Sequence, residues 1–127
     1  MSLGGPSAPG RGNSGAQAID RSVLGEWLAG DDVAINELLA VFRDSIRAEQ
    51  AKLLDTLAAG DLAEFASAAH RLRGAALSMG ARALAEVAGE LYAAARAGDA
   101  SGCAGGMAEL EAQVERMAAE VPGGPAP

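Results

Sequence analysis

The sequence contains one cysteine, one histidine and very few aromatic residues, and each scarcity excludes a class of protein. A single thiol cannot form an intramolecular disulfide, which favours a reducing compartment. A single imidazole cannot complete a histidine-rich metal site. No apolar run approaches the ~20 residues that span a bilayer, and the first residues lack the charged and apolar regions of a signal peptide. We therefore expect a cytoplasmic protein with no metal site and no membrane-spanning segment.

Basic residues are outnumbered by acidic ones, and the formal net charge is −7. The chain lacks the broad basic surface that binding to a nucleic-acid backbone requires, so we expect no nucleic-acid partner. Half of the residues are hydrophobic although only 3% are aromatic, and Ala and Leu supply most of the apolar content. Because Ala and Leu favour helices over strands, the composition predicts an all-α protein. A length of 127 residues fits one domain.

Composition divides the chain into three parts. Residues 1–18 are rich in Gly, Ser, Pro and Ala and show no apolar periodicity, which predicts a disordered N-terminal segment or a linker. Residues 122–127 have a similar composition and are expected to form a disordered tail. The folded domain is therefore predicted over residues 19–121.

Within this domain, Gly and Asp residues separate five predicted helices. We expect Asp20 to cap a short first helix that ends at Gly30, with Trp27 as its anchor. The four longer helices carry apolar residues every three or four positions, and short loops between them force antiparallel neighbours. The predicted fold is an antiparallel up-down-up-down four-helix bundle with a short additional N-terminal helix. The helices are expected over approximately residues 20–29, 31–59, 61–80, 81–97 and 99–121.

The face of the third helix that carries His70 differs from its core-facing stripe. The stripe runs through Ala69, Leu72 and Ala76, so His70 is expected to stand partly exposed. Gly74 lies one turn further on, and an exposed glycine inside a helix costs about 1 kcal/mol relative to Ala. Close approach by another molecule would compensate for that cost. The residues that share this face with His70 are Ala63, Ala66, Ser67, Arg73, Gly74 and Leu77.

This face combines a nucleophile with positive charge. A neutral imidazole is available near pH 7 and can accept and pass on a phosphoryl group. Arg73 lies one turn from His70 and can donate charge-assisted hydrogen bonds to a phosphate there. Arg71 and Arg82 add positive charge nearby on a protein that is acidic overall, and such a local basic patch suits an acidic partner pocket.

These residues resemble the signature of histidine-containing phosphotransfer (HPt) domains, which reads approximately Ala-His-x-Leu-Lys-Gly-x-(Ser/Ala)-x-x-x-Gly-Ala-x-x-Leu. The resemblance covers about residues 19–120. It departs from the family at Arg73, where Lys is usual, and at Tyr92, where Glu is common. A planar guanidinium replaces a point charge at Arg73, so phosphate geometry and transfer rate can differ. The matching residues are Ala69, His70, Leu72, Gly74, Ala76, Gly80, Ala81 and Leu84.

The resemblance implies a phosphocarrier rather than an autonomous enzyme. His70 would be phosphorylated and would exchange the group with an aspartate of a response-regulator receiver domain, while Arg73 steadies the phosphate and Gly74 leaves room for the partner. A histidine kinase or hybrid kinase is the other implied partner, and a monomer is expected. The chain itself needs no cofactor, and Mg²⁺ is expected on the receiver domain. The predicted partner-binding residues are Ala66, Ser67, Arg71, Leu77 and Arg82.

Other interpretations of the same residues stay open. The bundle can act as a phosphorylation-independent scaffold or inhibitor that docks a receiver or a histidine kinase. His70 can be a surface histidine without a role, and Gly74 can serve tight helix packing. Two-metal bundle sites pair a Glu with a His three residues later, but Ser67 holds that place here. Nothing marks an activated serine for a Ser-His-Asp triad, and Cys103 is expected to be a buried or half-buried small residue.

Overall fold

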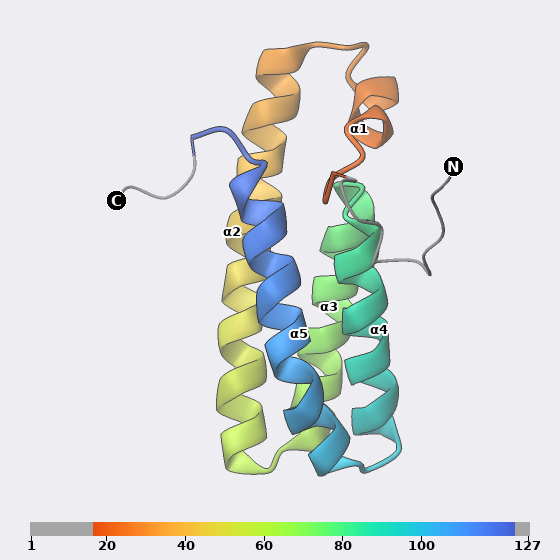
Figure 1. Ribbon diagram of the computed structural model, residues 1–127, viewed down its shortest axis with the longest axis vertical. Helices are drawn as coiled ribbons and strands as arrows, with labels where there is room; N and C mark the ends of the chain where they lie inside the picture. Colours follow the sequence, from red (N-terminus) through yellow and green to blue (C-terminus); the bar gives the residue numbers. More distant parts are fainter. Residues whose placement is uncertain (1–16, 124–127) are drawn as a thin grey trace, which may run out of the picture.

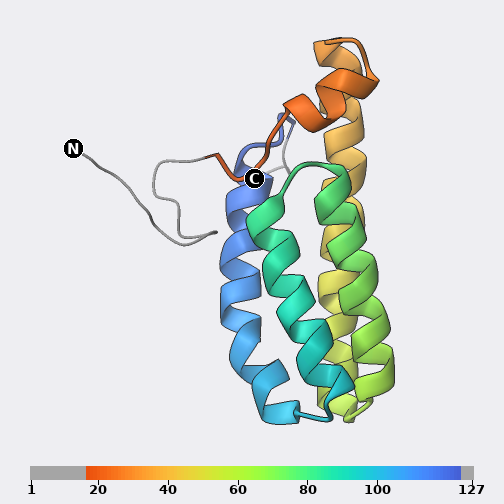
Figure 2. The same cartoon turned by 90° about the vertical axis from the view of Figure 1, so that its right-hand side faces the viewer.

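The computed structural model describes residues 17–123, which form five α-helices and no β-strand. Helices α2 to α5 run alternately in opposite directions and lie side by side, and α1 sits at one end of them (Figures 1 and 2). This confirms the predicted all-α antiparallel bundle with a short extra helix. The predicted disorder falls mostly on residues 1–16 and 124–127, which lie outside the described residues. The helices are α1 (Ser22–Trp27), α2 (Asp32–Ala59), α3 (Leu62–Ser78), α4 (Arg82–Arg96) and α5 (Ala100–Ala119).

Aspartate side chains begin three of the long helices. The carboxylates of Asp31, Asp61 and Asp99 each accept a hydrogen bond from the backbone N–H three residues further on, at 2.8–3.1 Å. Each bond satisfies one of the N–H groups that a helix start leaves unpaired. Asp20 acts differently from the prediction, because its carboxylate binds the backbone N–H and hydroxyl of Ser22 and the helix starts only at that residue.

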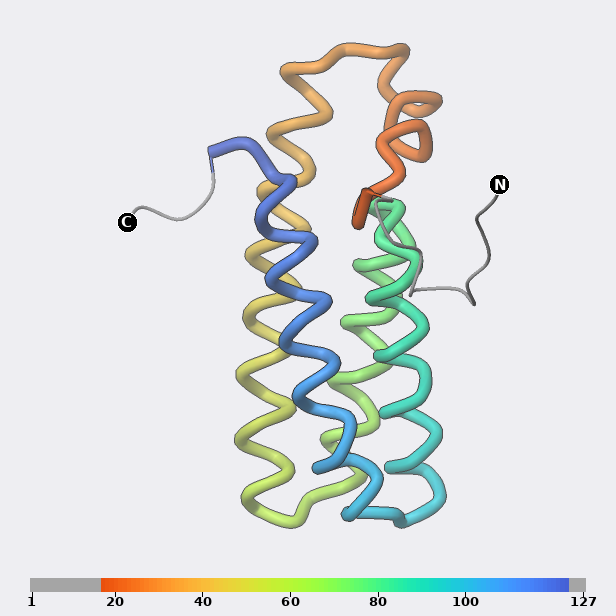
Figure 3. The backbone as a smooth tube through the Cα atoms, viewed as in Figure 1, coloured from red at the N-terminus to blue at the C-terminus, as the bar shows by residue number. Residues whose placement is uncertain are grey.

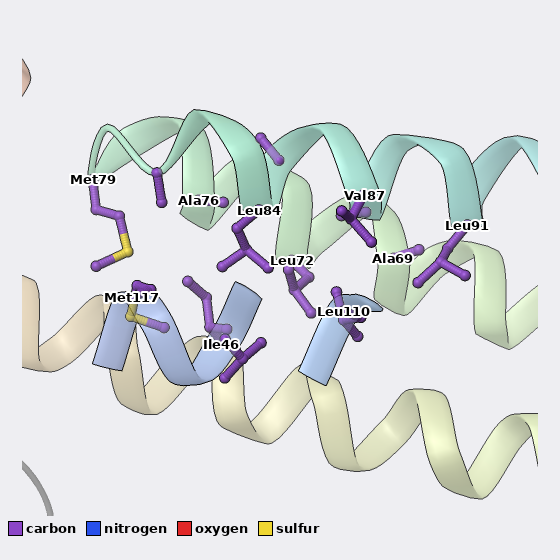
Figure 4. Packing of buried hydrophobic residues seen from close by; sticks show 14 of the residues in the cluster. Ile46, Ala69, Leu72, Ala76, Met79, Leu84, Val87, Leu91, Leu110 and Met117 are labelled. Carbon is purple, nitrogen blue, oxygen red and sulfur yellow. The ribbon is translucent and has the colours of Figure 1, made fainter. Parts of the chain in front are cut away.

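The predicted apolar stripes of α2 to α5 meet in one core of Leu, Ile, Val, Ala and Met around a single phenylalanine, Phe65. Figure 4 shows side chains from all four long helices converging there. Cys103 is fully buried in the same core. Leu38, Phe42 and Leu57 of α2 are only half-buried at its margin. The largest side chains with almost no exposure are Phe65, Ile19, Leu39, Ile46, Leu53, Leu72, Met79, Leu84, Leu91, Leu110, Met117 and Val87.

The expectation for Trp27 is wrong, because its side chain is 82% exposed. Leu24 anchors α1 instead and is almost completely buried. Helix α1 has only six residues, and it projects with the first turns of α2 beyond the ends of the other helices (Figure 2). So short a helix, lying beyond the end of the bundle, brings Leu24 into the core and leaves Trp27 in solvent.

The segment before α1 forms a strap across this end of the bundle. The backbone N–H groups of Ala18 and Ile19 donate hydrogen bonds to the two carboxylate oxygens of Glu120, at 2.5 and 2.9 Å. The Asp20 N–H donates to the carbonyl of Gly80 at 2.8 Å. Ile19 is only 2% exposed, and Ala18 is buried too although the predicted N-terminal segment included it. The strap thus connects the start of the described chain to the α3–α4 turn and the end of α5 (Figure 3).

Gly80 is required at this turn for two reasons. Its φ of +79° lies in the left-handed region that side chains with a Cβ rarely adopt. A Cβ at this position would also lie 2.3 Å from the Asp20 carbonyl oxygen. The strap therefore explains why the α3–α4 turn contains glycine.

The interfaces of the bundle are unequal. Helices α3 and α4 make the most extensive contact, where Ala69 and Ala76 face Leu84 and Val87 (Figure 4). Helices α2 and α5 make the sparsest contact among neighbouring long helices. The candidate site lies on the outer surface of the α3–α4 pair.

Candidate functional site

His70 lies on the outer face of α3 and is exposed to solvent. Its neighbours Ala69 and Leu72 point into the core and are fully buried. This alternation follows from the period of the helix, in which residues one and two positions apart face different directions. The predicted exposure of the only imidazole in the chain is therefore observed.

Tyr92 of α4 is the aromatic neighbour of His70. The two ring centres lie 5.6 Å apart and the ring planes are tilted by 46°. The Tyr92 hydroxyl accepts a hydrogen bond of 3.2 Å from Nη1 of Arg96, whose guanidinium carbon is 5.8 Å from the centre of the tyrosine ring. Sequence analysis singled out Tyr92 only as a departure from a family pattern and did not place it beside His70.

An open groove of about 620 Å³ surrounds these side chains between α3 and α4. Its rim carries the imidazole and two guanidinium groups, and small apolar residues form much of its surface. Ala66 was expected to be a partner contact, but its side chain is buried, so it can offer a partner little surface. The lining residues are Leu62, Ala63, Ala66, Ser67, His70, Arg71, Tyr92, Ala95 and Arg96.

The hydroxyl of Ser67 is directed back to its own helix. Its Oγ donates a hydrogen bond of 3.3 Å to the carbonyl of Ala63, one turn earlier. This is a common local arrangement for serine in helices. It gives no sign of an activated serine, in agreement with the weak case for a triad.

Arg71 is held by Glu49 of α2. The Arg71 Nε lies 3.0 Å from Oε2 of Glu49, and this hydrogen bond raises the pKa of the guanidinium further above its ordinary value. Only 12% of the Glu49 side chain is exposed. The carboxylate therefore balances much of the positive charge that Arg71 was expected to add. The pair also explains why α2 carries a carboxylate at the nearly buried position 49.

Three further predicted site residues line a second groove of about 440 Å³ between the same two helices. It contains Arg73, Leu77 and Arg82, and Leu77 is exposed as expected. The Arg73 side chain passes over Gly89 of α4, where a Cβ would lie 3.5 Å from its Cδ and Nε atoms. The structure thus places Ser67 and Arg71 with His70 and places Arg73, Leu77 and Arg82 in the neighbouring groove.

Gly74 lies open on the surface of α3. No heavy atom comes within 4 Å of the position that a Cβ would occupy, apart from the glycine's own helix backbone and chain neighbours. The interpretation that Gly74 serves tight helix packing therefore finds no support among the described residues. An unobstructed glycine one turn from His70 leaves the imidazole accessible along its own helix.

Residues 17–123 offer neither a metal site nor a membrane-spanning helix. No group of three or more His, Cys, Asp or Glu side chains there is arranged to hold a metal ion. No helix in this range is long and apolar enough to cross a membrane. Burial raises the pKa of the Cys103 thiol and therefore disfavours the reactive thiolate.

Comparison with known proteins identifies a family for most of the bundle. A family model described as Hpt domain matches residues 37–120, which include most of α2 and all of α3, α4 and α5. His70 and the residues lining both grooves lie in this range. No curated protein and no solved structure matches the chain.

Proposed function

Because this chain belongs to the Hpt domain family, whose members carry out histidine phosphotransfer in two-component systems, we propose that it carries a phosphoryl group on His70. One observation supports this assignment above all. Histidine phosphotransfer requires a histidine, the chain has only one, and that imidazole is exposed in a groove within the matched region. The group would be exchanged with an aspartate of a response-regulator receiver domain in a cytoplasmic phosphorelay.

The proposed step conserves one phosphoryl group. An unprotonated ring nitrogen of His70 attacks the phosphorus of an aspartyl phosphate and supplies the electron pair of the new N–P bond. The P–O bond to the carboxylate breaks, and the carboxylate leaves with that bond's electron pair. The proton on the other ring nitrogen can then pass to solvent, and transfer to a receiver reverses these steps. Such a reaction depends mainly on positioning and charge neutralisation.

Arg73 is proposed to supply charge neutralisation after a change of side-chain direction. Its guanidinium lies over Gly89 in the second groove, but residues three apart on a helix are neighbours. Rotation of the side chain toward a phosphorylated imidazole would let it donate two parallel hydrogen bonds to phosphate oxygens. We propose that Mg²⁺ and the remaining catalytic groups come from the receiver domain.

The partner surface is proposed to be α3 with the adjoining face of α4. Gly74 would let a receiver approach closely, and Ser67, Leu77 and Arg82 would contact it beside the imidazole. A histidine kinase or hybrid kinase would stand elsewhere in the same relay. The protein would act as a monomer, because this surface needs no second copy.

The test is phosphoryl transfer from a labelled receiver domain of the same organism to the native chain and to His70→Gln. We expect acid-labile, base-stable label on the native chain and none on the variant, because a phosphoramidate bond is broken in acid. Thermal unfolding of both chains serves as the folding control. Binding of receivers without label on the native chain would overturn the proposal in favour of a phosphorylation-independent scaffold.

A further inference from the structure

The geometry points to Tyr92 as a positioning residue that holds the His70 imidazole in one orientation, and to Arg96 as the residue that fixes Tyr92. This inference rests on the proposed function of His70 and deepens it. The orientation of the ring decides which of its two nitrogens faces an incoming phosphorus atom. We propose that Tyr92 thereby selects the nitrogen that is phosphorylated.

The His70 imidazole is restricted on one side and open on the other. An exposed histidine on a helix can rotate about its side-chain bonds unless a neighbour restricts it. Tyr92 lies beside the His70 ring at a centre-to-centre distance of 5.6 Å, within the range of interacting aromatic pairs. On its own helix, the side toward Gly74 is open. Tyr92 therefore restricts the imidazole on the α4 side, while a phosphoryl donor can approach it along α3.

The Tyr92 ring is itself held in place. Tyr92 is half-buried. Leu91, which precedes it, and Ala95, three residues after it on α4, are buried in the core. Arg96 lies four residues later on the same helix face, donates a hydrogen bond to the tyrosine hydroxyl and places its cation near the ring. The aromatic ring is therefore fixed before any phosphoryl donor arrives.

Tyr92 can be substituted without disturbing the core. It lines the groove together with Arg96, and its ring is not among the fully buried side chains. Alanine keeps the helix, since it is the strongest helix former. Tyr92→Phe keeps the ring and loses only the hydroxyl that Arg96 binds. A comparison of the two variants separates the effect of the ring from the effect of the hydrogen bond.

The experiment uses phosphoramidate, a small phosphoryl donor that needs no partner protein. Its P–N bond breaks with release of ammonia as the N–P bond to His70 forms. Native protein, Tyr92→Ala, Tyr92→Phe and Arg96→Met are phosphorylated, and NMR measures the formation rate and the ratio of the two phosphohistidine isomers. Trp27→Ala is the matched control, because it removes an exposed aromatic ring from α1, outside the groove.

We expect the native chain to form one isomer in excess. Tyr92→Ala should lower this excess by about two- to tenfold, the range expected for an aromatic pair. Tyr92→Phe and Arg96→Met should lower it by less than Tyr92→Ala does, because the ring stays but loses the hydrogen bond that fixes it, and Trp27→Ala should leave it unchanged. In the unphosphorylated native protein, the His70 ring protons should show ring-current shifts that Tyr92→Ala abolishes.

Three outcomes would overturn the inference, and they can be told apart. An unchanged isomer ratio in folded Tyr92→Ala would reject the role of Tyr92 and leave the phosphorylation of His70 intact. Native protein without ring-current shifts at His70 would reject the contact itself. Native protein that takes up no phosphoryl group, from phosphoramidate or from a receiver, would reject the proposed function together with the inference.

Discussion

The α3–α4 and α2–α5 interfaces close the same bundle by different means. The first joins small and branched apolar side chains, among them Ala76 and Val87, over the most extensive contact in the bundle. The second is the sparsest interface between neighbouring long helices, and long charged side chains lie on this side of the bundle. Arg47 of α2 meets Glu115 of α5 at 3.2 Å, and the nearly buried Arg43 reaches the carbonyl of Gly123 at 3.3 Å.

This difference indicates where the fold needs a fixed geometry. Small side chains allow two helix backbones to approach closely and leave little freedom in their relative placement. His70 and Tyr92 meet across the tightly packed pair, so their spacing follows from the core beneath them. Long flexible side chains tolerate changes in spacing, and the α2–α5 side carries none of the predicted site residues.

The largest expected effect comes from overfilling the tight interface. Ala76 is fully buried, so Ala76→Leu should lower the free energy of unfolding by about 1–3 kcal/mol. The separation of α3 and α4 should grow, and the His70–Tyr92 ring contact should weaken with it. Chemical denaturation measures the first effect and the ring-current shifts measure the second. Ala108→Leu makes the same change at an exposed position of α5 and should alter neither quantity.

Gly74→Ala should separate stability from function on the α3 side. Because nothing crowds the position, the added methyl should raise the free energy of unfolding by about 0.5–1 kcal/mol. The same methyl group should obstruct the receiver and lower its affinity by roughly tenfold, equivalent to about 1.4 kcal/mol. Calorimetric binding and denaturation measure the two effects.

Gly105→Ala is the matched control for this prediction, because Gly105 is an equally open glycine inside α5. It should give a similar gain in stability with no change in receiver binding. Equal receiver affinity for native protein and Gly74→Ala would contradict the proposed docking surface.

The ion pair on the α2–α5 side should contribute less. A double-mutant cycle with Arg47→Ala and Glu115→Ala is expected to give a coupling free energy of about 0.2–1 kcal/mol, as for other exposed pairs. The coupling should shrink in 1 M salt, where charges on the surface are screened. Phosphoryl transfer should be unaffected. A coupling above this range would show that this interface is as specific as the apolar one.

The smallest effect concerns Cys103 in the core. Burial raises the pKa of its thiol, so the folded protein retains this proton to a higher pH than the unfolded chain does. Its contribution to stability is therefore complete below the unfolded pKa and is lost as pH rises through the folded pKa. Native protein at pH 8 should react with a thiol reagent only on unfolding. The free energy of unfolding is measured for native protein and for Cys103→Ala at pH 7 and pH 10. The native protein should lose more stability between these pH values than the variant, and the difference is the contribution of the thiol.

The parts of the fold that depend on nearby residues could be predicted from the sequence. Helix caps such as Asp31 and Asp61 act within one helical turn, and the apolar spacing acts within two. The predicted helix order and the exposure of His70 follow from these local signals. The anchoring role given to Trp27 is wrong, because burial of a surface helix depends on where the rest of the bundle ends. The local spacing of apolar residues contains no information about where the other helices end.

The site itself was only partly predictable for a similar reason. The spacing on α3 identified His70 and its neighbours, but the register of α4 against α3 determines that Tyr92 lies beside it. That register is set by non-local packing of the core. The residue spacing on α3 also could not predict in which direction its long side chains point. Arg73 and Arg71 are two residues apart, yet the first lies over Gly89 and the second binds Glu49.

The hydrogen bonds between Glu120 and the strap have a consequence for how the chain folds during synthesis. The carboxylate that receives the N–H groups of Ala18 and Ile19 lies about a hundred residues later in the chain. While a ribosome extends the polypeptide, the strap can bind the Gly80 carbonyl through Asp20, but its contact with Glu120 cannot form until the last helix has left the exit tunnel. Ile19 therefore cannot make its final hydrogen bond before the end of α5 has been synthesised, and the contact between the strap and Glu120 is among the last to form among residues 17–123.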